Sequence, residues 1–211
     1  MPTTSSRTWT GLWADWEDES GPGGQNGAMS ADRADAGNPL VRLSREQIRD
    51  LAAKGWLTHD GMWYDQTARA LGVERANELN RAAIRAMAPF EVGRLCEALG
   101  VQPSEVRDAA AAARFVAEGI QLVTPASVGG HLHVRAGERV LQWEWEPGEC
   151  FAYKGMQRFG YLDGYECGVI YRVECWLEAL GVRPRGEPAV GVCLMHRTGR
   201  CAGELPLSLP G

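Results

Sequence analysis

The chain has 211 residues and a formal net charge of −5, and 45% of its residues are hydrophobic. This length suits one domain, or one domain with an extension, and the composition is sufficient for a normal core. An acidic chain without a basic block argues against a general nucleic-acid binder. No apolar run approaches the ~18 residues of a membrane span. The first 25 residues lack the basic start and apolar core of a signal peptide, so we expect a cytoplasmic protein.

Residues 1–39 are expected to form an arm that is separate from a single domain over residues 40–211. Residues 17–39 are mainly glycine, serine, aspartate and alanine, too poor in large apolar groups to offset the entropy of ordering. A short apolar stripe at helical spacing precedes them: Trp9, Leu12, Trp13 and Trp16. So short a helix is not stable alone in water. We expect the stripe to dock on another protein subunit; the alternative is that the arm folds back onto its own domain.

The first part of the domain reads as helical. A capping box of Ser44 and Gln47 predicts a helix over 45–54, and a second helix is predicted over 60–71. A third is expected from Glu74 onward, kinked or broken at Pro89, and a fourth over 105–118. The apolar period predicts that five large side chains of these helices are mostly buried: Trp63, Leu79, Ile84, Leu95 and Leu99.

The pattern then changes to strands. Residues 131–145 alternate in period two around a polar centre, which predicts a β-hairpin. A helix is expected over about 163–180, and residues 188–207 predict a strand, a turn at Thr198–Gly199 and a return strand. The order indicates the α+β class: an N-terminal helical half, followed by a small antiparallel sheet with one long helix.

Cysteines near the C-terminus are the main chemical signal. In a chain without a signal peptide, we expect thiols or metal ligands rather than a disulfide framework. A two-residue turn at Thr198–Gly199 would make His196 and Cys201 cross-strand neighbours, with Cβ atoms ~5 Å apart. The candidate ligands of a zinc or iron–sulfur site are Cys150, Cys167, Cys193, His196 and Cys201. Their spacing matches no standard zinc motif, and buried structural thiols or one reactive thiol are the alternatives.

Other polar residues are candidates for ligand chemistry. His59, at a predicted helix start, would stay neutral and could act as a base, or it could be a surface or capping residue. Trp63, Tyr64 and Glu78 are candidates for binding a small ligand, although the two aromatic rings could equally be core. His131 and His133 share one strand face, which suits either two ligands of one metal or an ordinary solvated face.

The segment HDGMWY at 59–64, followed by GVERANELN at 72–80, resembles an uncharacterised prokaryotic family with an H/D-G-x-W-[FY] segment and a G-x-E-x-A-x-E-L-[ND] helix. The matching residues are His59, Asp60, Gly61, Trp63, Tyr64, Gly72, Glu74, Ala76, Glu78, Leu79 and Asn80. That family is similar to the L-2-amino-thiazoline-4-carboxylic acid hydrolases and, more distantly, to the four-vinyl-reductase type of small-ligand domain. The resemblance covers residues 44–201 and is strongest over 59–99. It implies a small, cysteine-lined α+β pocket and a ring-opening hydrolysis.

These observations lead to two main hypotheses. The first is an accessory subunit that binds a small ligand or a metal and docks on a partner protein through its N-terminal arm. The second is a cysteine- or zinc-dependent hydrolase of a small cyclic C–N or C–S substrate. There His59 would be the base, and Cys193 or Cys201 the nucleophile or zinc ligand. A purely structural subunit is a third hypothesis, and it predicts a large apolar interface without a pocket.

Overall fold

The computed structural model describes residues 38–185 and 190–209. The tryptophan stripe at residues 9–16 lies outside the described residues, so its docking stays a prediction. The chain divides into two units, Met1–Arg42 and Leu43–Gly211. The described part of the first contains a short 3-10 helix, η1 (Pro39–Val41), and the second is the domain described below. A search of the described helices for one that could span a bilayer found none.

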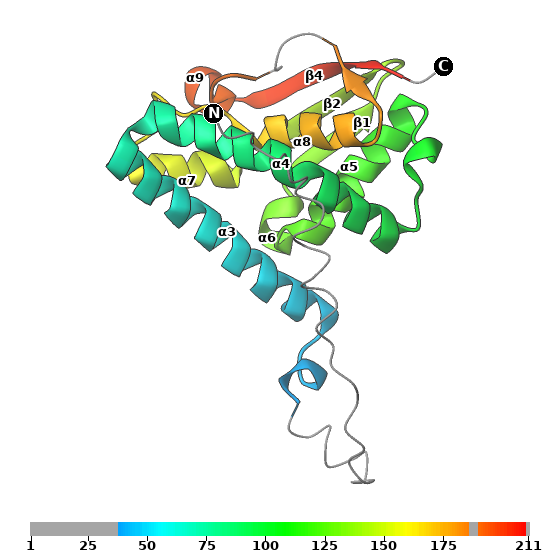
Figure 1. Cartoon of the computed structure of the whole chain (residues 1–211), viewed down its shortest axis with the longest axis horizontal. Helices are drawn as coiled ribbons and strands as arrows, with labels where there is room; N and C mark the ends of the chain where they lie inside the picture. The colour runs from blue at the N-terminus through cyan, green and yellow to red at the C-terminus, as the bar shows by residue number, and fades with distance from the viewer. Residues whose placement is uncertain (1–37, 186–189, 210–211) are drawn as a thin grey trace, which may run out of the picture. The chain divides into compact units, whose positions relative to one another are not determined.

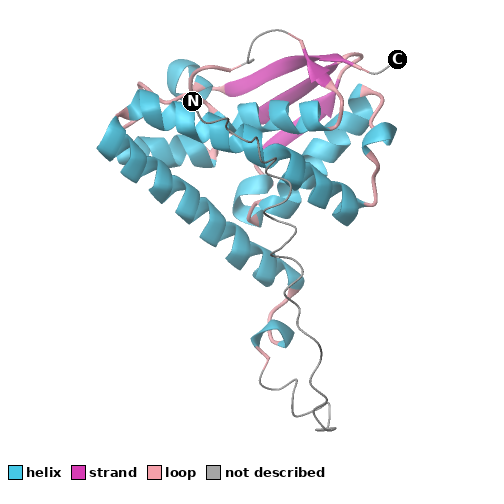
Figure 2. Ribbon diagram, in the orientation of Figure 1, coloured by secondary structure: helices cyan, strands magenta, loops and turns pink. Residues whose placement is uncertain are grey.

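The domain belongs to the α+β class, as the sequence predicts (Figures 1 and 2). Its helices are α3 (Arg45–Leu71), α4 (Val73–Leu99), η2 (Pro103–Glu105), α5 (Ala109–Val123), α6 (Ala126–Gly129), α7 (Phe151–Phe159), α8 (Gly168–Ala179) and α9 (Leu194–Thr198). Its strands are β1 (Leu132–Ala136), β2 (Val140–Trp145), β3 (Arg183–Pro184) and β4 (Cys201–Ser208). They form one antiparallel sheet in the order β1-β2-β4-β3. Figure 2 shows the strands along one side of the domain and the long helices on the other.

Helix α3 is continuous where the sequence predicts two helices. The capping box is confirmed: the Gln47 N–H donates to Ser44 Oγ (3.2 Å), and the Ser44 N–H donates to Gln47 Oε1 (2.8 Å). The helix then runs unbroken through Gly55 to Leu71. A glycine inside a helix costs only about 1 kcal/mol and does not end it by itself. The chain turns at Gly72, whose φ of 90° favours glycine.

Helix α4 likewise continues through Pro89, which the sequence predicts to kink or break it. Pro89 is exposed, whereas Ala88 and Val92 belong to the buried face of the helix. Packing of that inner face holds the helix together where proline removes one backbone hydrogen bond. Helix α5 begins later than expected, because Asp108 is its cap: the Ala111 N–H donates to the Asp108 side chain (2.7 Å).

Burial confirms part of the predicted helical core. Ile84 and Leu95 are buried, and Leu79 and Leu99 are half-buried. Trp63 was expected to be buried, but it is 41% exposed. The reason is helical phase: the adjacent Tyr64 lies on the face of α3 that meets the domain, and Trp63 is turned away by one residue.

The first hairpin is confirmed and the second is wrong. β1 pairs with β2 with Val134 opposite Trp143, and Leu141, Trp143 and Trp145 are buried. The segment before Thr198 is the short helix α9 rather than a strand. Gly199, with φ of 74°, ends this helix instead of forming a hairpin turn. Cys201 consequently lies opposite Trp145 of β2, and the predicted pairing of His196 with Cys201 is not formed.

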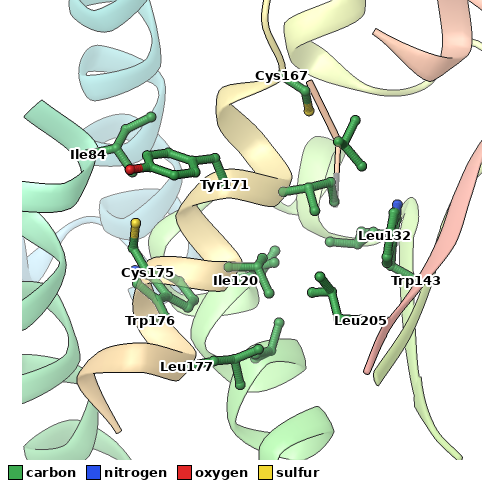
Figure 3. Close-up of a cluster of buried hydrophobic side chains, with 14 of the residues drawn as sticks. Ile84, Ile120, Leu132, Trp143, Cys167, Tyr171, Cys175, Trp176, Leu177 and Leu205 are labelled. Carbon is green, nitrogen blue, oxygen red and sulfur yellow. The ribbon is translucent and has the colours of Figure 1, made fainter. Parts of the chain in front are cut away.

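Helix α8 occupies the middle of the core. Figure 3 shows its side chains Tyr171, Trp176 and Leu177 with Ile84 of α4 on one side and Leu132, Trp143 and Leu205 of the sheet on the other, and Ile120 of α5 between α8 and the sheet. Trp176 and Leu177 are almost completely buried. The layers of this domain are therefore α3 and α4, then α8 with α5, then the sheet.

A buried amide fixes the loop that leads into α8. Tyr64 donates its hydroxyl hydrogen to Asn77 Oδ1 (2.6 Å), and the Glu166 N–H donates to the same oxygen (3.1 Å). The Asn77 Nδ2 group donates to the carbonyl of Gly164 (2.8 Å). Asn77 is 3% exposed, so each of these bonds is protected from water. Helices α3 and α4 and the loop at 160–167 are thereby held in one arrangement.

Two glycines inside helices test the packing around α8. A Cβ on Gly119 of α5 would lie 3.0 Å from Trp176 and 3.1 Å from Leu95, both buried, whereas a Cβ on Gly93 of α4 would meet nothing within 4 Å. We expect Gly119→Ala to lower the free energy of unfolding by about 1–3 kcal/mol through overpacking. We expect Gly93→Ala to raise it by about 0.5–1 kcal/mol. Urea unfolding midpoints measure both; a stabilised Gly119→Ala would contradict the packing.

The Asn77 network gives a second prediction. Tyr64→Phe removes one of the two donors to Asn77 Oδ1, which keeps the Glu166 N–H. This variant is expected to lower the free energy of unfolding by about 0.5–1.5 kcal/mol, the net contribution of one hydrogen bond. Asn77→Ala leaves three polar groups without their partner and is expected to cost more than Tyr64→Phe. Equal, small losses for both variants in thermal and urea unfolding would show that water replaces the amide.

Candidate functional site

A cavity of about 190 Å³ lies among α3, α4, α5, α7 and α8, with Trp145 of β2 at its wall. Most of its lining is apolar. Seven aromatic side chains contribute to it: Trp56, Tyr64, Trp145, Phe151, Phe159, Tyr165 and Trp176. Tyr64 and Tyr165 meet edge to face, with ring centroids 5.7 Å apart, and Trp145 meets Phe151 in the same way at 6.1 Å. Such a cavity suits a small, flat, mainly apolar molecule.

Arg172 of α8 lines the cavity, but its positive charge is paired with a carboxylate. Its guanidinium binds both carboxylate oxygens of Glu91, with Nε 2.9 Å from Oε2. The Trp176 indole N–H donates to the same Glu91 oxygen (2.6 Å). The rings of Trp56 and Trp176 also face the guanidinium, at 5.8 and 5.7 Å. Arg172 is therefore held in place and neutralised, and it does not make the cavity a site for anions.

Asp60 of α3 is the acidic group of the cavity. Within the described residues it accepts no hydrogen bond and forms no ion pair within 4.0 Å. Burial raises the pKa of its carboxyl, while the positive charge of Arg172 and the neighbouring His59 lower it to a smaller extent. A carboxyl with unsatisfied oxygens in an aromatic cavity is a hydrogen-bond acceptor for a ligand.

The other polar groups of the cavity come from α4 and the loop before α8. The hydroxyl of Tyr165 accepts a hydrogen bond from the Gly168 N–H (3.1 Å). The Asn80 amide lies against Gly168: a Cβ there would come within 2.9 Å of Asn80 Nδ2. The Tyr64 hydroxyl donates its hydrogen to Asn77, so this hydrogen is not available to a ligand. Asp60 and Asn80 remain the polar groups most available to a ligand.

The structure separates the residues that the sequence proposes for ligand chemistry. Tyr64 lines the cavity. His59 and Trp63 are exposed on α3, and Glu78 is exposed and forms an ion pair with Arg75. Asp60 was not among the residues predicted to bind a ligand. Its position four residues after Trp56 and four before Tyr64 places all three on one helical face, a signal that could have revealed it.

The predicted metal ligands are partly brought together. Cys150, Cys167, Cys193 and Cys201 are all buried in the core, and none lines the cavity. His196 is exposed and its Nε2 lies 2.9 Å from an Asp163 oxygen, so it does not join them. Among residues 38–185 and 190–209, no three His, Cys, Asp or Glu side chains are arranged as a group that could hold a metal ion.

The two histidines of the first hairpin share a carboxylate. His131 Nδ1 lies 2.7 Å from Glu146, and His133 Nε2 lies 3.2 Å from the same carboxylate. These hydrogen bonds lower the pKa of Glu146, with His131 the larger cause. Their side chains are partly exposed, as the solvated-face interpretation requires.

Comparison with known proteins found a match to one family model and identified no activity. A family model described as a family of unknown function (DUF6125) matches residues 41–116, which span α3, α4 and the first half of α5. No curated protein and no solved structure matched the chain. The matched region contains the helices that carry Asp60, Tyr64, Asn77 and Asn80, so it includes the α3–α4 side of the cavity.

Proposed function

We propose that this protein binds a small organic molecule in the cavity between α3 and α8, as an accessory subunit rather than as a structural one. The observation that supports this most directly is the Asp60 carboxyl, which faces an aromatic cavity without a partner among the described residues. Asp60 is half-buried, and even partial burial of a carboxyl without a hydrogen-bond partner costs free energy that a purely structural role does not require. A ligand that donates a hydrogen bond would remove that cost.

The cavity limits the ligand to roughly the size of one ring. Pockets for drug-sized molecules usually have volumes of ~300–1,000 Å³, and an apolar cavity of ~150 Å³ can hold benzene. At about 190 Å³, this cavity fits a single ring with a short substituent. Because Glu91 neutralises Arg172 and Asp60 has no such partner, the substituent should be a donor such as an amine or a ring N–H.

Hydrolysis of a small nitrogen heterocycle is the second candidate function. The resemblance of residues 59–80 to a family similar to the L-2-amino-thiazoline-4-carboxylic acid hydrolases motivates it, as does the raised pKa of Asp60, which suits a proton donor. Cysteine is not the nucleophile in this form of the hydrolase hypothesis. No cysteine lines the cavity, and burial raises the pKa of Cys150 to about 11 and of Cys201 to about 12. The proposed acid is therefore Asp60, with water as the nucleophile.

A docking role for the N-terminal arm is a separate proposal that rests on the sequence of residues 1–38. Truncation tests it: removal of these residues should leave the thermal unfolding midpoint of the domain nearly unchanged and abolish assembly with a partner subunit. An unfolded truncated chain, together with a monomeric full-length protein, would contradict docking.

Ligand binding can be tested with two probes that differ in one amine. Calorimetric titration of the full chain with benzylamine and with toluene should show tighter binding of benzylamine. Asp60→Asn should weaken benzylamine binding about 10-fold or more, since a hydrogen bond to a charged group contributes about 1.5–3 kcal/mol, and leave toluene binding unchanged. Benzylamine affinity should also fall with decreasing pH at a midpoint above the ordinary aspartate pKa, because protonation removes the charge.

The matched control for this test is Asp163→Asn, a change in an exposed carboxylate on the loop before α8. A further variant, Gly155→Leu, would fill the cavity: Gly155 lines it, and a Cβ there meets nothing within 4 Å. Both probes should lose affinity for Gly155→Leu while the protein stays folded. Equal benzylamine binding by Asp60→Asn and the wild type would refute the role of Asp60.

A further inference from the structure

One residue in the wall of the cavity carries a buried hydrogen-bond donor without an acceptor. Trp145 of β2 lines the cavity and is 2% exposed. Its indole N–H has no hydrogen-bond partner within the described part of the chain. An indole nitrogen is a donor only, and a buried donor that loses water without gaining an acceptor costs free energy. Because most buried polar groups in proteins are satisfied, this N–H group requires an explanation.

The N–H groups of the other tryptophans of the cavity and of β2 differ from that of Trp145. Trp176 also lines the cavity, but it donates to Glu91 Oε2 (2.6 Å). Trp56 lines the cavity and is 38% exposed, so water contacts its side chain. Trp143 has a buried N–H without a partner among the described residues, but it does not line this cavity. Trp145 therefore combines a place in the cavity wall with an unsatisfied donor.

The surroundings of Trp145 leave the cavity as the source of an acceptor. In the sheet, Trp145 lies opposite Leu132 of β1 and Cys201 of β4. Its ring meets Phe151 edge to face, with the ring centroids 6.1 Å apart. Hydrocarbon side chains accept no hydrogen bond, and a thiol is a weak acceptor. Strand pairing on both sides and the contact with Phe151 hold the indole in place, so a ligand would not have to order it.

Asp60 and Trp145 come from the two outer layers of the domain, α3 and the sheet, and both line the same cavity. Asp60 supplies an acceptor and Trp145 supplies a donor. Arg172 is paired with Glu91 and leaves no free positive charge for an anionic ligand. The acceptor that meets Trp145 is therefore an uncharged group, because burial of an unpaired anion would cost too much free energy.

We infer that the Trp145 N–H donates a hydrogen bond to the ligand. The ligand is then a single ring that carries an uncharged acceptor, a ring nitrogen or a carbonyl oxygen, in addition to the donor that Asp60 binds. This inference rests on the proposed ligand site at Asp60 and narrows its ligand class. Water is a poorer partner for Trp145, since a buried water molecule usually makes about three hydrogen bonds and Phe151, beside this ring, offers none.

The three isomers of picolylamine test this inference. Each differs from benzylamine only in a nitrogen that replaces one ring C–H group, so each keeps the amine for Asp60. Near neutral pH the ring nitrogen is uncharged, and in a purely apolar wall it would weaken binding because it loses its hydration. Calorimetric titration of the full chain should instead show at least one isomer that binds about 2- to 10-fold more tightly than benzylamine, the range that one net hydrogen bond contributes.

Nuclear magnetic resonance of the indole N–H groups gives a direct readout. The Trp145 signal, assigned from its loss in Trp145→Phe, should move downfield with the tightest-binding isomer and move less with benzylamine. The Trp176 signal should not show this difference between the two probes, since Glu91 already accepts its hydrogen bond.

The matched variants replace an indole by benzothiophene, which keeps the shape of the ring system and has sulfur in place of the N–H group. Benzothienylalanine in place of Trp145 should abolish the preference for picolylamine over benzylamine. The same replacement of Trp143 should leave that preference intact, because Trp143 does not line the cavity. If the variant at position 145 does not fold, the Trp145 signal of the wild-type protein decides.

The outcomes separate this inference from the proposed function. If toluene, benzylamine and the picolylamines all fail to bind, the proposed ligand site is wrong and the role of Trp145 is refuted with it. If benzylamine binds through Asp60 but every picolylamine binds more weakly, the Trp145 inference alone is overturned. An unchanged Trp145 signal, or a preference for picolylamine that survives the loss of the Trp145 N–H, would overturn it in the same way.

Discussion

The side-chain amide of Asn77 is the interaction on which the candidate site depends. It accepts hydrogen bonds from the Tyr64 hydroxyl and the Glu166 N–H and donates to the Gly164 carbonyl. A backbone loop can enter a protein interior only where its polar groups find partners. By satisfying two of them, Asn77 lets the loop at 160–167 pass beneath α3 and α4. That loop carries Tyr165 into the cavity wall and ends at Cys167, the residue before α8.

Arginine side chains connect α4 to α8 along the same side of the domain. Arg81 binds Glu166 and lies 4.3 Å from the centre of the Tyr171 ring, and Arg85 binds Glu178 and the Tyr171 hydroxyl. These partly exposed pairs contribute little to stability one by one. The planar guanidinium can bind a carboxylate and stack on a ring at once, which lysine cannot do. The pairs therefore fix the rotation of α8 about its axis more than they strengthen the fold.

Local signals account for the parts of the fold that the sequence predicts correctly. The Ser44–Gln47 capping box, the end of α4 at Gly100 and the β1–β2 hairpin each depend on residues within a few positions of one another. The β2–β4 pairing joins Trp145 to Cys201 across 55 intervening residues, and no local pattern contains it. Gly199 was ambiguous for a physical reason: a positive φ serves a hairpin turn and a helix C-terminus equally well.

The buried cysteines and the cavity differ in how far sequence could reveal them. Burial of the cysteines follows from residue type, because free cysteine is among the most buried side chains, and His196 was included only through the wrong hairpin. The cavity is formed by side chains of five helices that are far apart in the sequence, so its position could not be predicted from local patterns. Asp60, however, shares a helical face with Tyr64.

Helix α8 joins the loop at 160–167 to the cavity wall. Its first residue, Gly168, lines the cavity. There is no room for a side chain at Gly168, because a Cβ would lie 2.9 Å from Asn80 and 3.1 Å from Ile84. This close approach fixes the first turn of α8 against α4. Four residues further on, Arg172 is held by Glu91, and after another turn Trp176 closes the cavity wall. The start of α8 cannot shift without moving the cavity wall, so the position of Cys167 and the shape of the cavity are set together.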